Sequence, residues 1–494
     1  NLKQLMMQPP IAGQTVLGWD PAFRTGCKLA VIDPFGKVID TKVIYPTAPH
    51  NKVKEAKDIL KALIAKYHIT LISVGNGTAS RESEQIIADL IKEINAPVRY
   101  VITNEAGASV YSASKQATEE FPNFDVGQRS AVSIARRVQD PLAELVKIDP
   151  KAIGVGQYQH DMNQKKLDEM LHGTVEDCVN QVGVDLNTAS AALLEYVSGI
   201  TKTIAKNIVT YREENGQFTN RKQLLKVAKL GPKAYEQCAG FLRIHDGDNP
   251  LDDTSVHPES YEAAMKLLDK MGLTMEDVRT AQKQAARQLS TAAKPAPKQN
   301  NRNDRRKQIV IHNTNTAMGK ALAAAMGGSV MNLEENDSSA KKPVQKESAA
   351  NTVNAISSLE KKIRDKSRLA VELGIGEITL TDILKELEKP SRDPRESMPA
   401  PILRSDVLDM KDLKPGMILK GTVRNVIDFG AFVDIGVHND GLVHVSQMSN
   451  RYIQDPSEVE AVSVGDIVDV QVLSVDVPKK RIALTMKINR DQNK

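Results

Sequence analysis

The chain has 494 residues, which is long for a single core and predicts three or four domains. Its formal net charge of +4 is small, so a surface that binds nucleic acid must be local. Three cysteines that lie far apart, without a CxxC pair, argue against a disulfide framework or a zinc site and indicate reduced thiols in the cytoplasm. No apolar run approaches the ~20 residues that span a membrane, and no signal peptide is recognisable. The chain starts at Asn1 in a helical pattern, so we expect residues 1–14 to end an N-terminal helical region that is missing here.

Residues 15–147 have the pattern of an α/β domain with a mixed sheet. TVLGWD is a buried strand that ends in an acid, and KLAVIDPFGKVIDTKVIYP is two strands joined by a turn at residues 33–36. The helices VKEAKDILKALIAKY and SEQIIADLIKEI then alternate with the strands TLISVG and VRYVIT. This order of elements resembles the ribonuclease H-like fold, and within that fold the YqgF type.

Nucleases of the ribonuclease H-like fold hold two Mg²⁺ ions with several carboxylates. The resemblance implies a first acid on the first strand, and Asp20 is in that place. The strand that should supply the second acid runs into residues 75–77, Gly-Asn-Gly, and the final helix offers serines and alanines until Asp140. Other acids are nearby in the sequence but displaced, namely Glu82, Glu84 and Glu105. We therefore expect no catalytic residue, metal or cofactor, and we regard Asp20 as vestigial; a nuclease that uses Asp20 with displaced acids is the alternative.

Residues 148–250 contain two copies of a helix, a tight turn and a second helix. The turns fall at residues 198–200 in YVSGITK and 230–232 in AKLGPKA. Free N–H groups at the start of a helix, with lysines beside them, bind phosphates without distinguishing bases. From Leu186 to His245 nine Lys/Arg and four Asp/Glu give +5. The pattern is the helix-hairpin-helix, and the candidate phosphate-binding residues are Gly199, Lys202, Lys206, Lys229, Gly231 and Lys233. The alternative is a plain helical bundle that serves as a spacer.

Between the hairpins and the last domain we expect a helical extension at 251–289, a disordered basic linker at 290–350, and a helical segment with a linker at 351–404. From Ala281 to His312 eight Lys/Arg and one Asp give +7, and the low hydrophobicity indicates disorder that begins at Ala281. TLTDILKELEKP is a short helix within the last of these segments.

Residues 405–488 form the domain with the most informative pattern. In GTVRNVIDFGAFVDIGVHNDGLVHVS, β-branched residues alternate with polar ones and glycines mark the bends, which predicts short antiparallel strands. Alternation places Val433 in the core, and in RIALTMK it places the basic residues outside. An outward cluster of aromatic and basic groups favours stacking of unpaired bases. The residues of this predicted platform are Phe429, Phe432, His444, Arg481 and Lys487. The alternative is that the two phenylalanines close the bottom of a barrel.

This last segment resembles the S1 RNA-binding domain, a five-stranded OB-fold barrel, from about Lys414 to Ile488. The spacing of Phe429, Phe432 and His444 is that of the family, and the resemblance implies that they stack on bases. The acidic and basic pair of the family corresponds to Asp476 and Arg481, with one extra residue between them here. The region has eight Lys/Arg and nine Asp/Glu, so we expect stacking to contribute more than a basic field.

The order of the three domains resembles the bacterial Tex family of transcription accessory proteins. The phrases that carry the resemblance include FRTGCKLAVID, GNGTASRE, NEAGASVYSAS, IGVGQYQHD and GLVHVSQ. The resemblance implies α/β, all-α and all-β domains in one chain. It also implies binding of RNA and DNA with little sequence specificity and a role near transcription. We expect single-stranded RNA and DNA as ligands, RNA polymerase as a partner, no membrane association and no enzymatic activity. The other functional classes are the nuclease above and a ribosome-associated RNA-binding protein.

Overall fold

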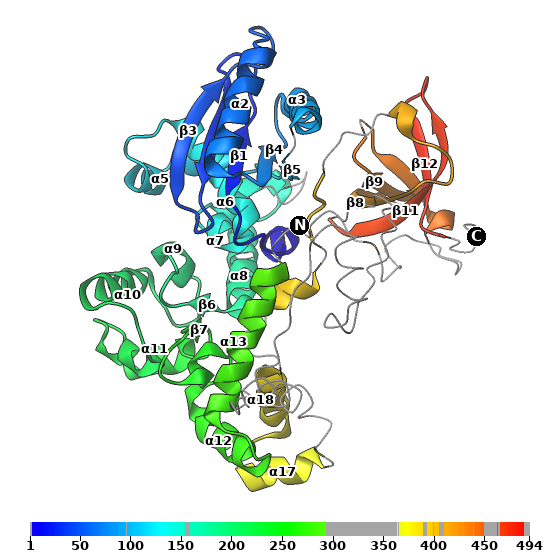
Figure 1. Ribbon diagram of the computed structural model, residues 1–494. Coiled ribbons are helices and arrows are strands. Elements are labelled where there is room, and N and C mark those ends of the chain that lie inside the picture. Colours follow the sequence, from blue (N-terminus) through cyan, green and yellow to red (C-terminus); the bar gives the residue numbers. More distant parts are fainter. Residues whose placement is uncertain are drawn as a thin grey trace, which may run out of the picture.

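The computed structural model contains an α/β domain, a helical region and a β-barrel along one chain (Figure 1). The predicted fold class is therefore confirmed. The structure describes residues 2–94, 96–153, 159–292, 363, 365–388, 393–398, 400–404, 410–427, 429–437, 439–448, 462 and 465–488. None of the helices in these ranges is both long enough and apolar enough to cross a membrane.

The α/β domain has a five-stranded sheet of mixed direction. Its strands are β1 (Val16–Asp20), β2 (Cys27–Ile32), β3 (Val38–Ile44), β4 (Leu71–Gly75) and β5 (Arg99–Thr103). The sheet order is β3-β2-β1-β4-β5, in which β2 is antiparallel to β1 and β3, while β4 and β5 run parallel to β1. The mixed sheet, and the order of strands and helices along the chain, are those that the sequence predicted.

Helices cover both faces of this sheet. α2 (Val53–Tyr67) and α3 (Ser80–Glu93) pack on the face that carries Leu17 and Trp19, and α6 (Val126–Gln139) packs on the opposite face. The α6 backbone lies so near the sheet that a Cβ at Gly18 would be 2.1 Å from the carbonyl oxygen of Ala131. Only glycine fits at this position of β1. The remaining helices of the domain are α4 (Ala108–Ser112), α5 (Lys115–Glu120) and α7 (Pro141–Leu145).

The helical region shares one core with α1 (Leu2–Met6), which precedes the α/β domain in the sequence, and with α7, which ends that domain. α1 and α7 pack with α8 (Gln164–Val182), α9 (Ala191–Leu194), α10 (Lys202–Asn215) and α11 (Pro232–Cys238). A short parallel pair, β6 (Val184–Asp185) with β7 (Leu242–Arg243), joins the two ends of the hairpin region. Arg221 is 1% exposed and its guanidinium donates to the carbonyls of Leu242, Thr254 and Val256. These bonds tie the first hairpins to the helices that follow.

Four further helices make a second helical cluster at the lower end of the molecule (Figure 1). They are α12 (Tyr261–Lys270), α13 (Met275–Ala292), α17 (Lys366–Leu373) and α18 (Glu377–Glu388). The prediction of disorder from Ala281 is wrong for its first part, because α13 continues to Ala292. Alanine, glutamine and arginine favour helix even where hydrophobicity is low. Apart from residues 290–292, the predicted basic linker at 290–350 lies outside the described residues.

The C-terminal domain is a closed five-stranded barrel. Its strands are β8 (Ile418–Ile427), β9 (Gly430–Asp434), β10 (Gly441–His444), β11 (Ile467–Asp476) and β12 (Arg481–Thr485), in the order β10-β12-β11-β8-β9. The segment before the barrel returns to the α/β domain, where the backbones of Arg404 and Tyr100 exchange hydrogen bonds of 2.8 and 2.9 Å. This bridge holds the barrel next to β5.

Candidate nucleic-acid interface

The outer face of the barrel carries a row of side chains across four strands. Phe432 of β9 is opposite Asn425 of β8 and Leu442 of β10, and Leu442 is in turn opposite Ala483 of β12. Val433 points to the other side and is fully buried in the barrel core. Phe432 is half-buried on the outer face, so its ring is available at the surface without filling the core.

A backbone hydrogen bond brings the segments that carry Phe429 and His444 together at one end of this row. The ring-bearing Phe429 is 50% exposed, and its carbonyl accepts a 2.9 Å hydrogen bond from the N–H of Val445, next to the exposed His444. His444 Nδ1 lies 2.9 Å from the hydroxyl of Ser446, which orients the imidazole. Gly430 allows the two strands to approach closely here, because a Cβ would lie 2.3 Å from the Val443 carbonyl oxygen. The structure therefore places Phe429, in the turn before β9, next to the end of β10 that carries His444, with Phe432 further along β9.

The two predicted basic residues are placed differently from each other. Arg481 is exposed at the start of β12, two residues before Ala483 and on the same face, and its register partner is Asp476. β12 ends at Thr485, whose side chain is buried under the turn that contains Gln447. Strand alternation therefore stops before Lys487, which lies beyond the barrel strands with its N–H bonded to the Thr485 hydroxyl. The strand therefore ends two residues before Lys487, and a role of Lys487 in RNA binding stays a prediction.

The other end of the outer face abuts the α/β domain. Asp434 accepts a 2.6 Å hydrogen bond from Arg424, and Arg404 bridges Asp434 at 3.7 Å and Glu84 of α3 at 3.3 Å. Burial opposes ionisation of Asp434, but the bonds from Arg424 and the Gly436 N–H, with the charges of both arginines, hold its pKa below the usual value. The barrel is thus joined to the α/β domain by paired charges.

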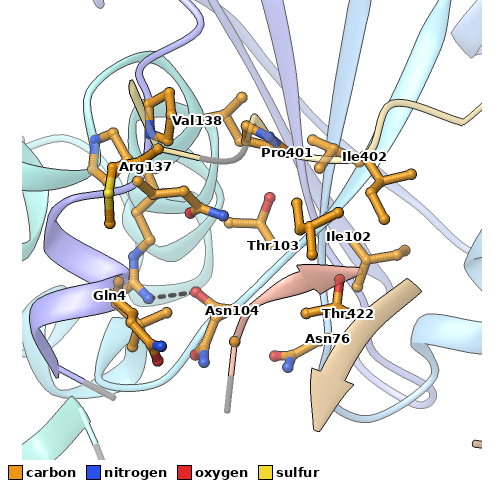
Figure 2. A pocket seen from close by; sticks show the side chains of 18 of the residues that line it. Gln4, Asn76, Ile102, Thr103, Asn104, Arg137, Val138, Pro401, Ile402 and Thr422 are labelled. Carbon is orange, nitrogen blue, oxygen red and sulfur yellow. Dashed lines mark hydrogen bonds between the residues drawn. The ribbon is translucent and has the colours of Figure 1, made fainter. Parts of the chain in front are cut away.

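A cavity of about 400 Å³ lies at this junction, between α1, β5 and the barrel (Figure 2). Figure 2 shows Arg137 reaching into it from α6, with Nη1 bonded to the carbonyl of Asn104 at 2.7 Å. Burial lowers the pKa of Arg137 to about 10, although the charges of Glu144 and Glu105 oppose this. Thr422 of the barrel lines the opposite wall.

The first two hairpins present lysines at the start of helices. Gly199 has φ of 81° and packs against α11, where a Cβ would lie 2.6 Å from the Cβ of Gln237. α10 then starts with Lys202, and Lys206 follows one turn later; both are exposed. In the second copy Lys229 has φ of 68°, Gly231 caps α11, and Lys233 is in its first turn. Within the described residues none of these four lysines makes an ion pair, so their charges are available to phosphates.

The acids of the α/β domain come together only in part. Asp20 ends β1, is bonded to the hydroxyl of Ser130 on α6, and is the register partner of Lys28. Burial raises the pKa of Asp20, and the Ser130 bond and the Lys28 charge oppose that shift. Glu105 covers the end of β4, where a Cβ at Gly75 would lie 2.1 Å from its carboxylate. Burial, then repulsion by Asp20, raises the pKa of Glu105.

The other candidate acids serve elsewhere. Glu84 accepts from the hydroxyl of Tyr100, Glu82 is exposed in the first turn of α3, and Asp140 caps α7 and pairs with Arg395 at 2.7 Å. In the described part of the chain, no three His, Cys, Asp or Glu side chains are grouped so that they could hold a metal ion.

Comparisons with known proteins match this arrangement domain by domain. Residues 14–139 match the Tex protein YqgF-like domain, residues 179–243 a helix-hairpin-helix motif, and residues 412–487 the S1 RNA binding domain. Residues 249–303 and 320–395 match a further helix-hairpin-helix domain. The transcriptional accessory protein Tex of Neisseria gonorrhoeae is 44% identical over 490 residues, 99% of this chain and 54% of that protein.

The chain belongs to the Tex family. Protein tex of Bordetella pertussis is 45% identical over 99% of the chain and 52% of its own length, and uncharacterized protein YdcI of Bacillus subtilis is 50% identical over 98% and 57%. The chain spans about half the length of the curated relatives it matches. This Tex-family chain combines an S1 RNA-binding domain with helix-hairpin-helix regions, which are domains of nucleic-acid-binding proteins.

Sequence reasoning missed two features of this Tex-family site. It treated Glu105 as displaced, whereas the carboxylate approaches Asp20 because residues 75–77 include two glycines that leave room for it. It also missed the hairpin character of α12–α13 and α17–α18, although each turn has a glycine followed by an aliphatic residue, Gly272-Leu273 and Gly374-Ile375. The Gly-aliphatic turn between two helical patterns was the available signal.

Proposed function

We propose that this chain binds single-stranded RNA through the outer face of its S1 domain, as part of a transcription accessory factor that acts near RNA polymerase. The observation that carries the proposal is the exposed pair Phe429 and His444 beside Phe432 on one face of the barrel. Aromatic rings on an open sheet face stack on unpaired bases of any sequence. The name of the Neisseria relative supports the role in transcription.

The first hairpins extend the binding surface and make DNA a second ligand. Their exposed lysines at helix starts contact phosphates, which RNA and DNA share, and the +5 balance of residues 186–245 favours that contact. The three cysteines are free and buried, which supports a reducing compartment, and we place the protein in the cytoplasm.

We further propose that the α/β domain is not catalytic. Asp20 has Ser130 and Lys28 as neighbours and Glu105 as a nearby carboxylate, where a two-metal nuclease would need further carboxylates. The domain then acts as a scaffold that fixes the S1 domain and the hairpins relative to each other.

Titration of a labelled single-stranded RNA at several salt concentrations tests the binding proposal. We expect log K to fall linearly with log salt because lysines release counterions from phosphates. Lys202→Glu with Lys233→Glu should weaken RNA and duplex DNA binding alike and reduce the salt slope by about 2. Lys42→Glu with Lys92→Glu makes the same charge change on exposed residues of the α/β domain that are not at a helix start and should have a smaller effect. A salt-independent affinity, or equal losses in both double variants, would contradict the phosphate contacts.

A further inference from the structure

Four turns in the helical region share one backbone design. Each has a residue with left-handed φ, and the values are 81°, 68°, 68° and 72° for Gly199, Lys229, Gly272 and Gly374. An aliphatic residue follows each and packs inward, namely Ile200, Leu230, Leu273 and Ile375. A helix then begins within two residues, as α10, α11, α13 and α18. We call α9–α11 the first hairpin unit and α12, α13, α17 and α18 the second hairpin unit.

The two units differ in the charge of the helix starts. The first unit has Lys202 and Lys233 in the first turns of its helices. In the second unit these turns are acidic, with Glu276 and Asp277 in α13 and Glu377 in α18. Carboxylates suit the positive end of a helix dipole and repel phosphate. The second unit therefore keeps the hairpin geometry and lacks the charge that phosphate binding needs.

The second unit also exposes aliphatic side chains. Val371 of α17 is 82% exposed and Ile378 of α18 is 80% exposed. Ser367 donates to Glu377 at 2.8 Å, which joins α17 to α18, and the ion pair of Lys270 with Glu372 joins α17 to α12. Leucine, isoleucine and valine residues on the other side of the helices fill the core of the unit. Val371 and Ile378 therefore contribute little to the stability of the unit.

Acidic residues surround the two aliphatic side chains. Asp382 lies one turn after Ile378 on α18 and is exposed, as are Glu372 and Glu377. From Asp365 to Glu388 six Asp/Glu and three Lys/Arg give −3; Arg368, one turn before Glu372, and Lys385, two turns after Ile378, are exposed cations in this range. The unit is at the end of the molecule opposite the α/β domain (Figure 1). An apolar centre with an acidic rim is the complement of an apolar patch with a lysine and arginine rim.

We infer that the second hairpin unit is a protein-docking surface, on which Val371 and Ile378 contact an apolar patch of a partner protein and the surrounding carboxylates pair with its lysines or arginines. The inference goes beyond nucleic-acid binding and assigns the two hairpin units to different partners. The first unit contacts phosphates, and the second contacts a protein with a basic surface.

Photo-cross-linking in cells that express the chain, with the photoreactive group placed on the chain itself, tests the inference. A diazirine-bearing aliphatic amino acid replaces Ile378 in one variant, and in the matched control it replaces Leu225, which is 47% exposed in the first unit. We expect the probe at 378 to give a product with another protein that survives nuclease treatment. The peptide mapped on that protein should hold lysines or arginines beside apolar residues. The probe at 225 should give products that nuclease removes.

Charge reversal distinguishes a specific surface from accidental contact. Asp382→Lys, combined with the probe at 378, should remove most of the product, while thermal melts stay unchanged because Asp382 is exposed on α18. Captured protein counts as support only with a basic mapped peptide and this loss. The inference is overturned by a product at 378 that nuclease removes, by a cross-link within the chain or to a second copy, or by no product. An unchanged yield after charge reversal also overturns it.

Discussion

The outer face of the S1 barrel and the strand ends of the α/β sheet are both places where a β-sheet presents side chains for chemistry. On the barrel, the strands leave Phe429 and His444 in contact with solvent. On the α/β sheet, α6 lies against β1, Ser130 bonds Asp20, and Glu105 covers Gly75. The difference shows that the presence of a β-sheet does not decide which surface can bind a ligand. The neighbouring side chains decide it, because they either fill the space beside the strands or leave it open.

The sharpest test of the barrel side of this comparison is a pair of adjacent substitutions. Phe432→Ala should weaken RNA binding by about 1–3 kcal/mol with little loss of stability, because stacking is lost from an outer face. Val433→Ala should do the reverse and cost about 2 kcal/mol of unfolding free energy, because it leaves a cavity in the core. RNA titrations and thermal melts of both variants measure the effects. If Phe432→Ala unfolds the domain and Val433→Ala leaves it folded, the assignment of outward-facing residues is shifted by one residue.

The comparison also depends on how the two sheets are joined. Arg404→Ala removes the pairs to Glu84 and Asp434, so the S1 domain should separate from the α/β domain more often, at a cost of about 1 kcal/mol. Small-angle scattering should report a larger radius of gyration, whereas RNA affinity should change little. Lys420→Ala, which breaks a surface pair with Asp469 between β8 and β11, is the control and should leave the radius unchanged. An equal radius in both variants would show that other contacts hold the domains together.

The α/β side predicts a pH effect. In the folded protein the pKa of Glu105 is raised by burial and by Asp20, so its ionised form lowers stability above that pKa. Glu105→Gln should therefore raise the melting temperature near pH 7, and the gain should shrink as pH falls towards about 4, where the wild-type carboxyl is protonated. Glu82→Gln, on an exposed residue of α3, serves as the control. A gain that is equal at both pH values would contradict the electrostatic explanation.

The smallest expected effect is on catalysis. Incubation of labelled junctions, duplexes and RNA–DNA hybrids with Mg²⁺ or Mn²⁺ should yield no cleavage by the wild type or by Asp20→Asn. A binding assay with the same labelled substrates confirms that each protein preparation still binds nucleic acid. Cleavage by the wild type that disappears in Asp20→Asn would make the α/β domain a nuclease and reverse the comparison.

Much of this architecture is predictable because its signals are local. Alternation in AFVDIG separates Val433 from Phe432, and helical spacing in residues 53–67 gives α2 with the bounds observed. The meeting of Glu105 with Asp20 depends on packing between segments far apart in the sequence, which no local pattern encodes. Lys487 shows a different limit: alternation describes a strand only while the strand lasts, and β12 stops at Thr485.

The backbone bridge between Arg404 and Tyr100 has a consequence for solubility. β5 is the last strand of its sheet, and its free N–H and C=O groups are a template on which another chain can pair. The 400–404 segment occupies that template at Tyr100. A chain cut after residue 398 would lose both the S1 domain and this cover, so its tendency to aggregate should rise for a reason unrelated to RNA.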